Sequence, residues 1–502
     1  MTTLWSLIEK RAAEAPDAPA LLIGDTRIGN AAFRDTALRI AGALRAKGIG
    51  KGDIVAVQLP NVPEYLLAYA AICALGATMQ TVHMPYRRAE LKMLLGHSQA
   101  KAFLGLAQFK DVQPAAEVEG LRAELPALRH VLHDFAALKA HAPLAAAEPC
   151  SPDDRFLLLY TSGTTDNPKG VPLPYRGFLE NARRSVAELQ VGPSDVLLSA
   201  APLTHLYGLF VYHLGLQAGA AMSLLPAFTP PDLAATVEKH RVTGVFAGPA
   251  HFKPILDAGL MDKHDFAPVK FICLSGSAVP PVLAKDVEAK LPSGRTIQLW
   301  GMSELQAGSY CRPTDPAFVR HETAGGPSPG TDLRVVDDED RVLPAGQEGR
   351  LQVKALSLFA GYLDNPHATQ AAFTPDGWFD TGDTARLTPE GALQLTGRVK
   401  EIINRGGVKY SPIDIEAILD RVPGVARTAV VPYPDPVLGE KACVFVQAAA
   451  DAAPPTLAQL TQALEAAGIA KFKWPERLER IDALPLTPTQ KVMRGRLRDL
   501  LK

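Results

Sequence analysis

Residues 160–170 read Tyr-Thr-Ser-Gly-Thr-Thr-Asp-Asn-Pro-Lys-Gly, which places hydroxyls, glycines and a lysine within eleven positions. An apolar run, residues 156–160, precedes this stretch, and an extended pattern resumes at Gly170. The pattern predicts an exposed loop between two strands. Such a loop can offer backbone N–H groups, hydroxyls and an ammonium to one polyanion, which favours phosphate binding over a plain Ser/Thr-rich surface turn.

On both sides of this loop, short apolar strands alternate with helix-like stretches. Before the loop, the pattern predicts strands at 54–59 and 78–83 and helices at 33–47 and 64–75. After it, strands are predicted at 195–200, 221–225, 244–248 and 271–274, and helices at 231–240, 251–256 and 282–291. This order is typical of βαβ units and a mainly parallel sheet. We therefore expect one or two packed α/β lobes over residues 1–315.

From Gly325 the chain changes to proline, glycine and short alternating strands, which predicts a small β-rich subdomain over about residues 316–399. Its strands are expected at 332–337, 349–355, 378–380 and 392–395. An α+β unit is predicted to follow from Lys400, with strands near 402–403, 428–431 and 442–446 and helices at 412–419 and 456–466. The expected fold class is therefore multidomain α/β.

Composition limits the classes of function. The 52 basic and 53 acidic residues nearly cancel, so no global field draws the protein to nucleic acid or to an anionic membrane. Five scattered cysteines without a Cys-x-x-Cys pair argue against a zinc ribbon or a disulfide scaffold and suit a reducing cytoplasm. The N-terminus lacks the apolar core of a signal peptide, and the most apolar run, residues 65–79, favours a buried helix leading into a strand over a membrane span.

Two further stretches have the chemistry of a nucleotide site. Residues 298–304, Gln-Leu-Trp-Gly-Met-Ser-Glu, end a predicted strand with an aromatic ring for a base and a carboxylate for Mg²⁺. A core tryptophan followed by a surface glutamate is the alternative. Residues 275–278, Ser-Gly-Ser-Ala, follow a strand at its carboxyl end, where open α/β sheets bind ligands, although Gly-Ser turns are common.

Three later stretches carry charge. Residues 378–383, Trp-Phe-Asp-Thr-Gly-Asp, place Asp383 just after a predicted turn, where its carboxylate can accept bonds from ribose hydroxyls; a simple hairpin turn is the alternative. Residues 396–412 hold two arginines, two lysines and a Gly-Gly pair, which favours an anion-binding loop over a solvated charged linker. Residues 484–491 place Lys491 in a proline-stiffened segment, which alone indicates no function.

Common nucleotide fingerprints do not explain these stretches. The loop is not a Walker A motif, because Pro168 precedes the lysine and Gly170 follows it. No Gly-x-Gly-x-x-Gly follows a predicted strand, which disfavours a nicotinamide dehydrogenase. The Gly-x-Ser-x-Gly match at residues 326–330 has prolines beside its serine and no helix pattern after it, so it is not a nucleophile elbow.

Taken together and in this order, the stretches resemble the adenylate-forming superfamily of acyl- and aryl-CoA synthetases, carrier-loading adenylation domains and beetle luciferases. The resemblance covers nearly the whole chain. It implies an N-terminal portion of residues 1–399 and a mobile C-terminal domain of residues 400–502, with Lys400 as the hinge. It also implies that a carboxylic acid attacks the α-phosphate of ATP to give acyl-AMP and pyrophosphate, after which a thiol takes the acyl group.

The resemblance assigns site residues by motif. ATP phosphates are expected on Thr161, Ser162, Gly163, Thr164, Thr165 and Lys169. The adenine and its neighbourhood are expected beside Ser277, Ala278, Trp300, Gly301, Met302 and Ser303. Mg²⁺ is expected on Thr165 and Glu304, and ribose on Asp383 and Arg398. The catalytic residues implied are Lys491, His205 and Glu304. Rotation at Lys400 would bring up a CoA tunnel formed by Arg405, Gly406 and Gly407.

The acid pocket is implied less specifically. His205, in the stretch 202–208, matches a residue beside the acyl group in relatives. The rest of the pocket is expected to include Phe246, Gly248, Pro249, Ser275, Gly276, Met302 and Gln306. No aspartate occurs in residues 204–216, where amino-acid-activating relatives carry one, so we expect a medium-sized aliphatic, alicyclic or aromatic acid.

The acceptor and the assembly are less defined. CoA is favoured because no carrier domain follows Lys502, while a standalone carrier-loading ligase stays open as the alternative. A luciferase-like monooxygenase and a non-catalytic nucleotide sensor are further alternatives. A homodimer is compatible with the sequence.

One residue departs clearly from the family pattern. Asp166 stands where the loop usually has glycine, and its carboxylate would repel a triphosphate. We therefore expect Asp166 to point away from the phosphates and an Asp166→Gly variant to keep or improve the KM for ATP. Trp300 and Ser303 replace the more usual Tyr and Thr, which are mild changes of size.

Overall fold

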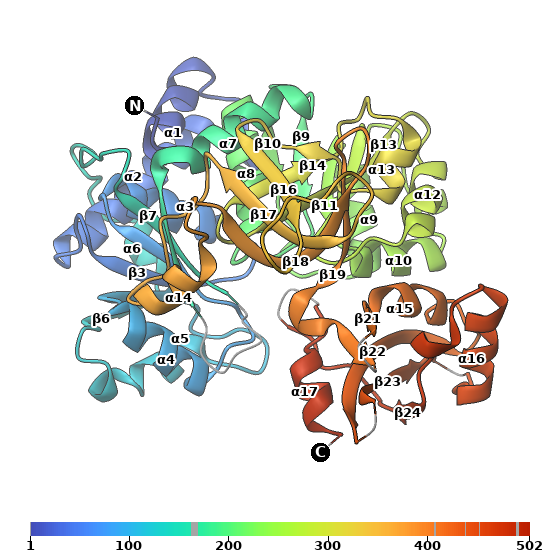
Figure 1. The fold of residues 1–502 in the computed structure, drawn as a ribbon. Helices are drawn as coiled ribbons and strands as arrows, with labels where there is room; N and C mark the ends of the chain where they lie inside the picture. Colours follow the sequence, from blue (N-terminus) through green and yellow to red (C-terminus); the bar gives the residue numbers. More distant parts are fainter. Residues whose placement is uncertain are drawn as a thin grey trace. The chain divides into compact units, whose positions relative to one another are not determined.

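The computed structural model describes residues 2–161, 169–405, 408–436, 438–450, 452–487 and 491–501 (Figure 1). Their contacts divide them into two units. The first comprises residues 2–161, 169–331 and 355–371, and the second comprises residues 332–354 and 372–501. This division groups the β-rich residues with the C-terminal ones. Packing does not locate a hinge, so the domain boundary at Lys400 stays a prediction.

The first unit contains a six-stranded sheet whose neighbours are all parallel except for one hairpin at its edge. The strand order is β6-β5-β3-β4-β7-β8. The strands are β3 (Ile54–Gln58), β4 (Thr78–Thr81), β5 (Ala102–Gly105), β6 (His130–Leu132), β7 (Arg155–Tyr160) and β8 (Gly170–Pro174). The helices of this part are α2 (Asn30–Ala46), α3 (Pro63–Ala74), α4 (Arg88–Ser98), α5 (Pro114–Glu119), η1 (Arg122–Glu124) and α6 (Phe135–Lys139).

Strands β7 and β8 lie on either side of residues 161–169 in the sequence. Tyr160 pairs with Gly170 in an antiparallel register, so the predicted arrangement of strand, loop and strand is confirmed at both ends. The apolar run of residues 65–79 forms the buried helix α3 and leads into β4, as predicted. Within the described part of the chain, no helix is long and apolar enough to cross a membrane.

The first unit also contains a nine-stranded sheet of order β15-β14-β13-β12-β11-β9-β10-β1-β2. The strands are β1 (Pro19–Ile23), β2 (Thr26–Gly29), β9 (Val196–Ser199), β10 (Ala221–Ser223), β11 (Gly244–Ala247), β12 (Phe271–Leu274), β13 (Arg295–Met302), β14 (Gln306–Tyr310) and β15 (Gly326–Pro327). Its middle strands are parallel, and β2, β14 and β15 pair in antiparallel fashion. The N-terminal strand β1 pairs with β10, so distant parts of the chain complete one sheet.

Amphipathic helices supply the core beside this sheet. One apolar cluster joins residues of β9, β11 and β12 to α9 (Pro230–Lys239), α10 (Pro249–Asp257) and α12 (Pro281–Ala289). By contrast, α8 (Leu206–Ala218) is apolar around its circumference, which is typical of a helix enclosed by protein. The remaining helices are α1 (Leu4–Glu14), α7 (Tyr175–Glu188), α11 (Leu260–Lys263), α13 (Ala317–Glu322) and α14 (Pro366–Ala372).

The second unit contains two smaller sheets. A four-stranded sheet is built from β16 (Thr331–Val336), β17 (Gly349–Ala355), β18 (Phe379–Leu387) and β19 (Leu393–Arg398), and its last three strands pair in antiparallel fashion. The other consists of β20 (Ile403–Arg405), β21 (Val408–Tyr410), β22 (Val425–Asp435), β23 (Gly439–Ala448) and β24 (Arg477–Arg480). The helices are η2 (Val399–Glu401), α15 (Ile413–Leu419), α16 (Leu457–Ala466), η3 (Lys471–Lys473) and α17 (Arg494–Asp499).

Candidate active site

The predicted phosphate-binding residues fall only partly within the described structure. Ser162, Gly163, Thr164 and Thr165 lie outside the described residues, as does Asp166, so the expectation about its direction stays a prediction. At the two ends of the loop, the Thr161 N–H donates to the Lys169 carbonyl at 3.0 Å. This bond continues the β7–β8 hairpin and brings the first and last predicted phosphate contacts together.

Lys169 and Glu304, far apart in sequence, both contact Tyr362. The Lys169 ammonium lies 4.6 Å from the centre of the Tyr362 ring. The Tyr362 hydroxyl donates to Glu304 Oε1 at 3.0 Å. The predicted phosphate lysine and the predicted metal carboxylate therefore share a neighbour in the first unit, and sequence patterns had not indicated this tyrosine.

The predicted adenine neighbours come from adjacent strand ends. β12 and β13 are parallel and pair Leu274 with Gln298, so residues 275–278 leave the sheet at the edge toward which Trp300 and Glu304 continue. Ser277 and Ala278 are exposed, while Trp300 and Glu304 are only 5% and 4% exposed. Gly308 allows the Trp300 ring to pack closely, because a Cβ there would lie 2.3 Å from it. Adenine contacts at this edge stay a prediction.

Glu304 has the chemistry that Mg²⁺ requires. A carboxylate oxygen is a hard ligand, and Mg²⁺ in nucleotide sites usually takes one or two protein carboxylates together with phosphate oxygens. Within the described residues, no group of three or more His, Cys, Asp or Glu side chains is arranged to hold a metal. The Glu304 carboxylate is chemically suited to a nucleotide-bound Mg²⁺, and this role stays a prediction.

His205 is oriented by the helix that it caps. It is the N-cap of α8, and its Nδ1 accepts the Tyr207 N–H at 3.2 Å. That bond requires an unprotonated Nδ1, so the neutral ring carries its proton on Nε2. The His83 ring lies 6.5 Å from the His205 ring at 24°, and His83 Nδ1 is hydrogen bonded to Thr204 Oγ1 at 2.8 Å. Burial lowers the pKa of His83 to about 4, which keeps this neighbour neutral.

The other predicted pocket residues have mixed surroundings. Phe246 is fully buried and packs edge-on against Tyr207, Phe210 and Phe271. Gly248 and Ser275 follow the paired strands β11 and β12 and so leave the sheet side by side. Partly exposed positions are Pro249, Gly276, Gly301, Met302 and Ser303. Their role as an acid pocket stays a prediction.

Gln306 has a partner that the sequence did not suggest. Its Nε2 lies 3.2 Å from His213 Nδ1, and the other ring nitrogen of His213 lies 3.0 Å from the Tyr69 hydroxyl. In the sequence, this contact is indicated only by the isolated position of His213 within an apolar helical pattern. The amide of Gln306 is therefore hydrogen bonded to α8 within the core.

In the second unit, Asp383 and Arg398 face each other across β18 and β19. Arg398 Nε lies 2.8 Å from Asp383 Oδ1. The prediction of a turn before Asp383 was wrong, because β18 continues through this position. Gly382, with φ +72°, instead forms an irregularity opposite Leu351, and the Thr381 hydroxyl both donates to the Leu351 carbonyl and accepts the Asp383 N–H. A bulge therefore orients this carboxylate.

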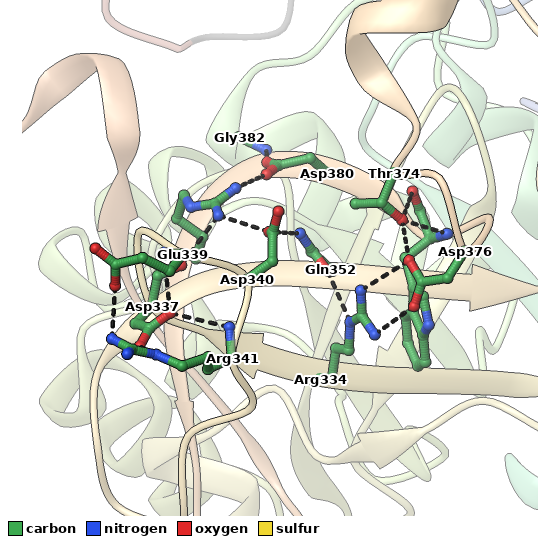
Figure 2. Close-up of polar contacts among 12 residues, drawn as sticks. Arg334, Asp337, Glu339, Asp340, Arg341, Gln352, Thr374, Asp376, Asp380 and Gly382 are labelled. Carbon is green, nitrogen blue, oxygen red and sulfur yellow. Dashed lines mark hydrogen bonds and ion pairs between the residues drawn. The ribbon is translucent and has the colours of Figure 1, made fainter.

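A polar network lies beside this bulge (Figure 2). Asp380 accepts the Gly382 N–H at 3.1 Å and pairs with Arg350. Arg350 also donates to Asp340 at 2.7 Å, and Asp340 accepts from Gln352 at 2.8 Å. The backbone before the predicted ribose carboxylate is thus held by the Arg350–Asp380 ion pair, which joins β17 to β18, and Arg350 also pairs with Asp340.

The predicted hinge Lys400, the CoA-tunnel residue Arg405 and the predicted catalytic Lys491 lie further along the second unit. Lys400 lies in η2, and Arg405 ends β20, where it pairs with Glu476 and donates to the Phe472 carbonyl at 3.0 Å. Gly406 and Gly407 lie outside the described residues. Lys491 is exposed, and its carbonyl accepts the Thr487 N–H at 2.7 Å.

A mostly buried arginine, with 13% of its side chain exposed, follows Lys491 closely. Arg494 donates to both Glu416 oxygens at 2.5 and 2.7 Å, to Glu401 at 2.9 Å and to the Val430 carbonyl at 2.9 Å. Burial alone would lower its pKa, but Glu416 and Glu401 outweigh burial and raise it. The segment that carries Lys491 is therefore tied to α15, β22 and the end of η2.

Two family models match most of the chain. The model described as "AMP-binding enzyme" matches residues 8–363, and "AMP-binding enzyme C-terminal domain" matches residues 414–491. The chain therefore belongs to the AMP-binding enzyme family, within the adenylate-forming superfamily. The predicted superfamily, the multidomain α/β fold class and the class of AMP-forming ligase are confirmed.

Individual relatives cover almost the whole chain. It is 30% identical to a 3-[(3aS,4S,7aS)-7a-methyl-1,5-dioxo-octahydro-1H-inden-4-yl]propanoyl:CoA ligase of Mycobacterium tuberculosis (strain ATCC 25618 / H37Rv), over 100% of this chain and 99% of that protein. It is 31% identical to a 2,3-dihydroxybenzoate-AMP ligase of Bacillus subtilis (strain 168), over 99% and 94%. ATP-bound MatB from Rhodopseudomonas palustris superposes with a TM-score of 0.89 at 25% identity, over 99% of both chains.

Proposed function

We propose that the chain is an ATP-dependent carboxylic acid–CoA ligase. It converts a medium-sized aliphatic, alicyclic or aromatic acid to acyl-AMP with release of pyrophosphate, and it then transfers the acyl group to the CoA thiol. The observation that carries this proposal is the joint placement of Lys169 and the buried Glu304 carboxylate around one tyrosine at the end of the hydroxyl-rich loop. The CoA ligase of Mycobacterium tuberculosis, of which 99% is covered by the match, supports CoA as the acceptor.

The first half-reaction needs positive charge around the α-phosphorus. Lys169 supplies an ammonium to the phosphates, and Lys491 is the residue proposed to contact both the acid carboxylate and the α-phosphate. Mg²⁺, held by Glu304 and by the predicted ligand Thr165, would add positive charge to the phosphate oxygens. Asp383 would accept hydrogen bonds from the ribose hydroxyls, and Arg398, whose Nε lies 2.8 Å from Asp383 Oδ1, holds this carboxylate in place.

The second half-reaction needs a path for a thiol. Rotation at Lys400 would remove Lys491 and bring up Arg405 with the neighbouring glycines, as the resemblance implies. His205, with its proton on Nε2, would offer a neutral donor beside the acyl group. The pocket residues include no carboxylate to pair with an ammonium, which supports an acid without an α-amino group.

Lys491→Ala separates the two half-reactions. We expect acid-dependent ATP–pyrophosphate exchange to fall by at least about 100-fold, because one charge-stabilising group contributes on that scale. Thioester formation from synthetic acyl-AMP and CoA should be retained. Lys471→Ala, at another exposed lysine of the second unit, is the matched control. Full retention of exchange by Lys491→Ala would contradict the proposed mechanism.

The acid and the acceptor are tested by a panel of carboxylic acids assayed for pyrophosphate release with and without CoA. The proposal expects CoA-dependent turnover with formation of an acyl-CoA. One relative is named as an AMP ligase without mention of CoA, so transfer to a carrier protein is the alternative to be tested. Acyl-AMP formation with transfer to a phosphopantetheinylated carrier but none to CoA would favour that alternative.

A further inference from the structure

Tyr362 belongs to a segment, residues 357–363, that connects two parts of the proposed ATP site. At its start, the Ser357 hydroxyl donates to the Leu305 carbonyl at 2.5 Å, and the Phe359 N–H donates to the Glu304 carbonyl at 2.8 Å. At its end, the Leu363 N–H donates to the Gly170 carbonyl at 2.8 Å. The 357–363 segment is thus hydrogen bonded both to the turn that carries Glu304 and to the residue after Lys169.

The Tyr362 side chain is fixed within this segment. Its ring packs edge-on against Phe359, with centres 4.8 Å apart and an angle of 69°. Its backbone N–H donates to the Thr369 hydroxyl at 2.9 Å. Because ring and backbone are both held, the contacts of the side chain with Lys169 and Glu304 have defined directions.

Each of these contacts concerns a different charged group. The face of the ring attracts the Lys169 ammonium, which lies 4.6 Å from its centre. The hydroxyl donates to Glu304 Oε1 at 3.0 Å and so orients a buried carboxylate by a charge-assisted bond. One rigid side chain therefore places a cation and an anion of the proposed site relative to each other.

We propose that Tyr362 is a positioning residue for ATP and Mg²⁺, whose ring directs Lys169 toward the phosphates and whose hydroxyl directs Glu304 toward the metal. The inference rests on the proposed function. It divides the two tasks between two parts of one side chain, so that each can be removed separately.

Two substitutions separate these tasks. Tyr362→Phe keeps the ring beside Lys169 but removes the hydroxyl from Glu304, whereas Tyr362→Leu removes both contacts. ATP affinity is measured by calorimetry in EDTA and then in Mg²⁺, and Mn²⁺ affinity of the enzyme–ATP complex by paramagnetic resonance. Tyr65→Phe is the matched control, because Tyr65 is buried in α3 and its hydroxyl has no hydrogen-bond partner among the described residues.

Tyr362→Phe should leave ATP affinity in EDTA unchanged but reduce the gain from Mg²⁺, and the Mn²⁺ affinity, by about tenfold, the scale of one hydrogen bond to a charged group. Tyr362→Leu should also weaken ATP binding in EDTA by several-fold. An unchanged metal-dependent gain in Tyr362→Phe would overturn the proposal, as would equal losses in both variants accompanied by an equal fall in Tm. If the wild type binds ATP but no acid supports exchange, the proposed function fails, while these binding measurements still judge the role of Tyr362.

Discussion

Two regions bury polar groups in opposite ways. In the first unit, the interior beside α3 and α8 contains neutral imidazoles, and burial lowers the pKa of His83 to about 4 and of His213 to about 3. Beside α15 and α17 in the second unit, Arg494 is ionised and lies between two glutamates. Large sheets covered by helices exclude water from their interior, where a neutral hydrogen-bonded ring costs less than a charge. Ions persist in the smaller unit because each finds several partners.

This difference in buried polar groups predicts that the two regions lose stability for different reasons. A neutral buried network loses stability when it gains a proton, whereas a buried ion cluster loses stability when one partner is removed. The regions should therefore respond differently to acid and to single substitutions.

The largest effect is expected from Arg494→Met. It leaves Glu401 and Glu416 without their shared cation, and breaking a buried pair typically costs about 3–5 kcal/mol. Denaturant-dependent hydrogen exchange, read by mass spectrometry in α15 and β22, measures the loss. Arg496→Met, an exposed position of the same helix, should leave exchange unchanged. Equal protection in the two variants would refute the importance of the cluster.

A smaller effect is expected from Asp420→Asn, which should stabilise the protein more at high pH than at low pH. Burial raises the pKa of Asp420 from 3.8 to about 6, even though its Oδ1 accepts two hydrogen bonds from Thr428. The stability that this proton contributes is complete below pH 3.8 and is lost as the pH rises through 6. The asparagine, which keeps an acceptor oxygen, should stabilise β22 by up to ~3 kcal/mol at pH 8. Urea titrations at pH 8 and pH 4 check this, and a gain of the same size at both would contradict it.

The smallest of the three effects concerns His83→Asn. The pKa of His83 in the folded protein is depressed from 6.5 to about 4. The stability that the neutral ring contributes is therefore present above pH 6.5 and is lost as the pH falls toward 4. At pH 5 the wild type should have lost ~2 kcal/mol through this residue relative to pH 7.5. The asparagine can keep a bond to Thr204 but does not titrate, so hydrogen exchange in β4 should depend less on pH. An unchanged slope would show that His83 is not protonated in this range.

Local patterns predicted most of the elements, and they did so where local forces decide the structure. The β7–β8 hairpin, α3 and strand β12 follow directly from runs of apolar residues and their breaks. The turn predicted before Asp383 was wrong because the conformation of Gly382 depends on a hydrogen bond between Thr381 and Leu351, which lies on another strand. No pattern near residue 383 carries that information.

Candidate site residues divide in a similar way. Lys169, Glu304 and Asp383 lie in compact stretches whose residue types alone suggest phosphate, metal and ribose. Tyr362 and His83 could not be recognised from a local stretch of sequence, because their importance comes from contacts with residues distant in sequence. A tyrosine after a glycine, or a histidine after a strand, has too many ordinary explanations to stand out.

The pairing of β1 with β10 has a consequence for biosynthesis. On the ribosome, Leu21 emerges long before its partner Met222. Strand β1 therefore cannot pair with β10 until most of the first unit has been synthesised. Strand β4, which follows the apolar helix α3, likewise pairs with β7 only after Leu157 has been synthesised. Pairings of such long sequence separation slow folding and leave apolar surface open to other chains. A nascent chain stalled before residue 222 is therefore expected to need a chaperone, whatever the stability of the finished enzyme.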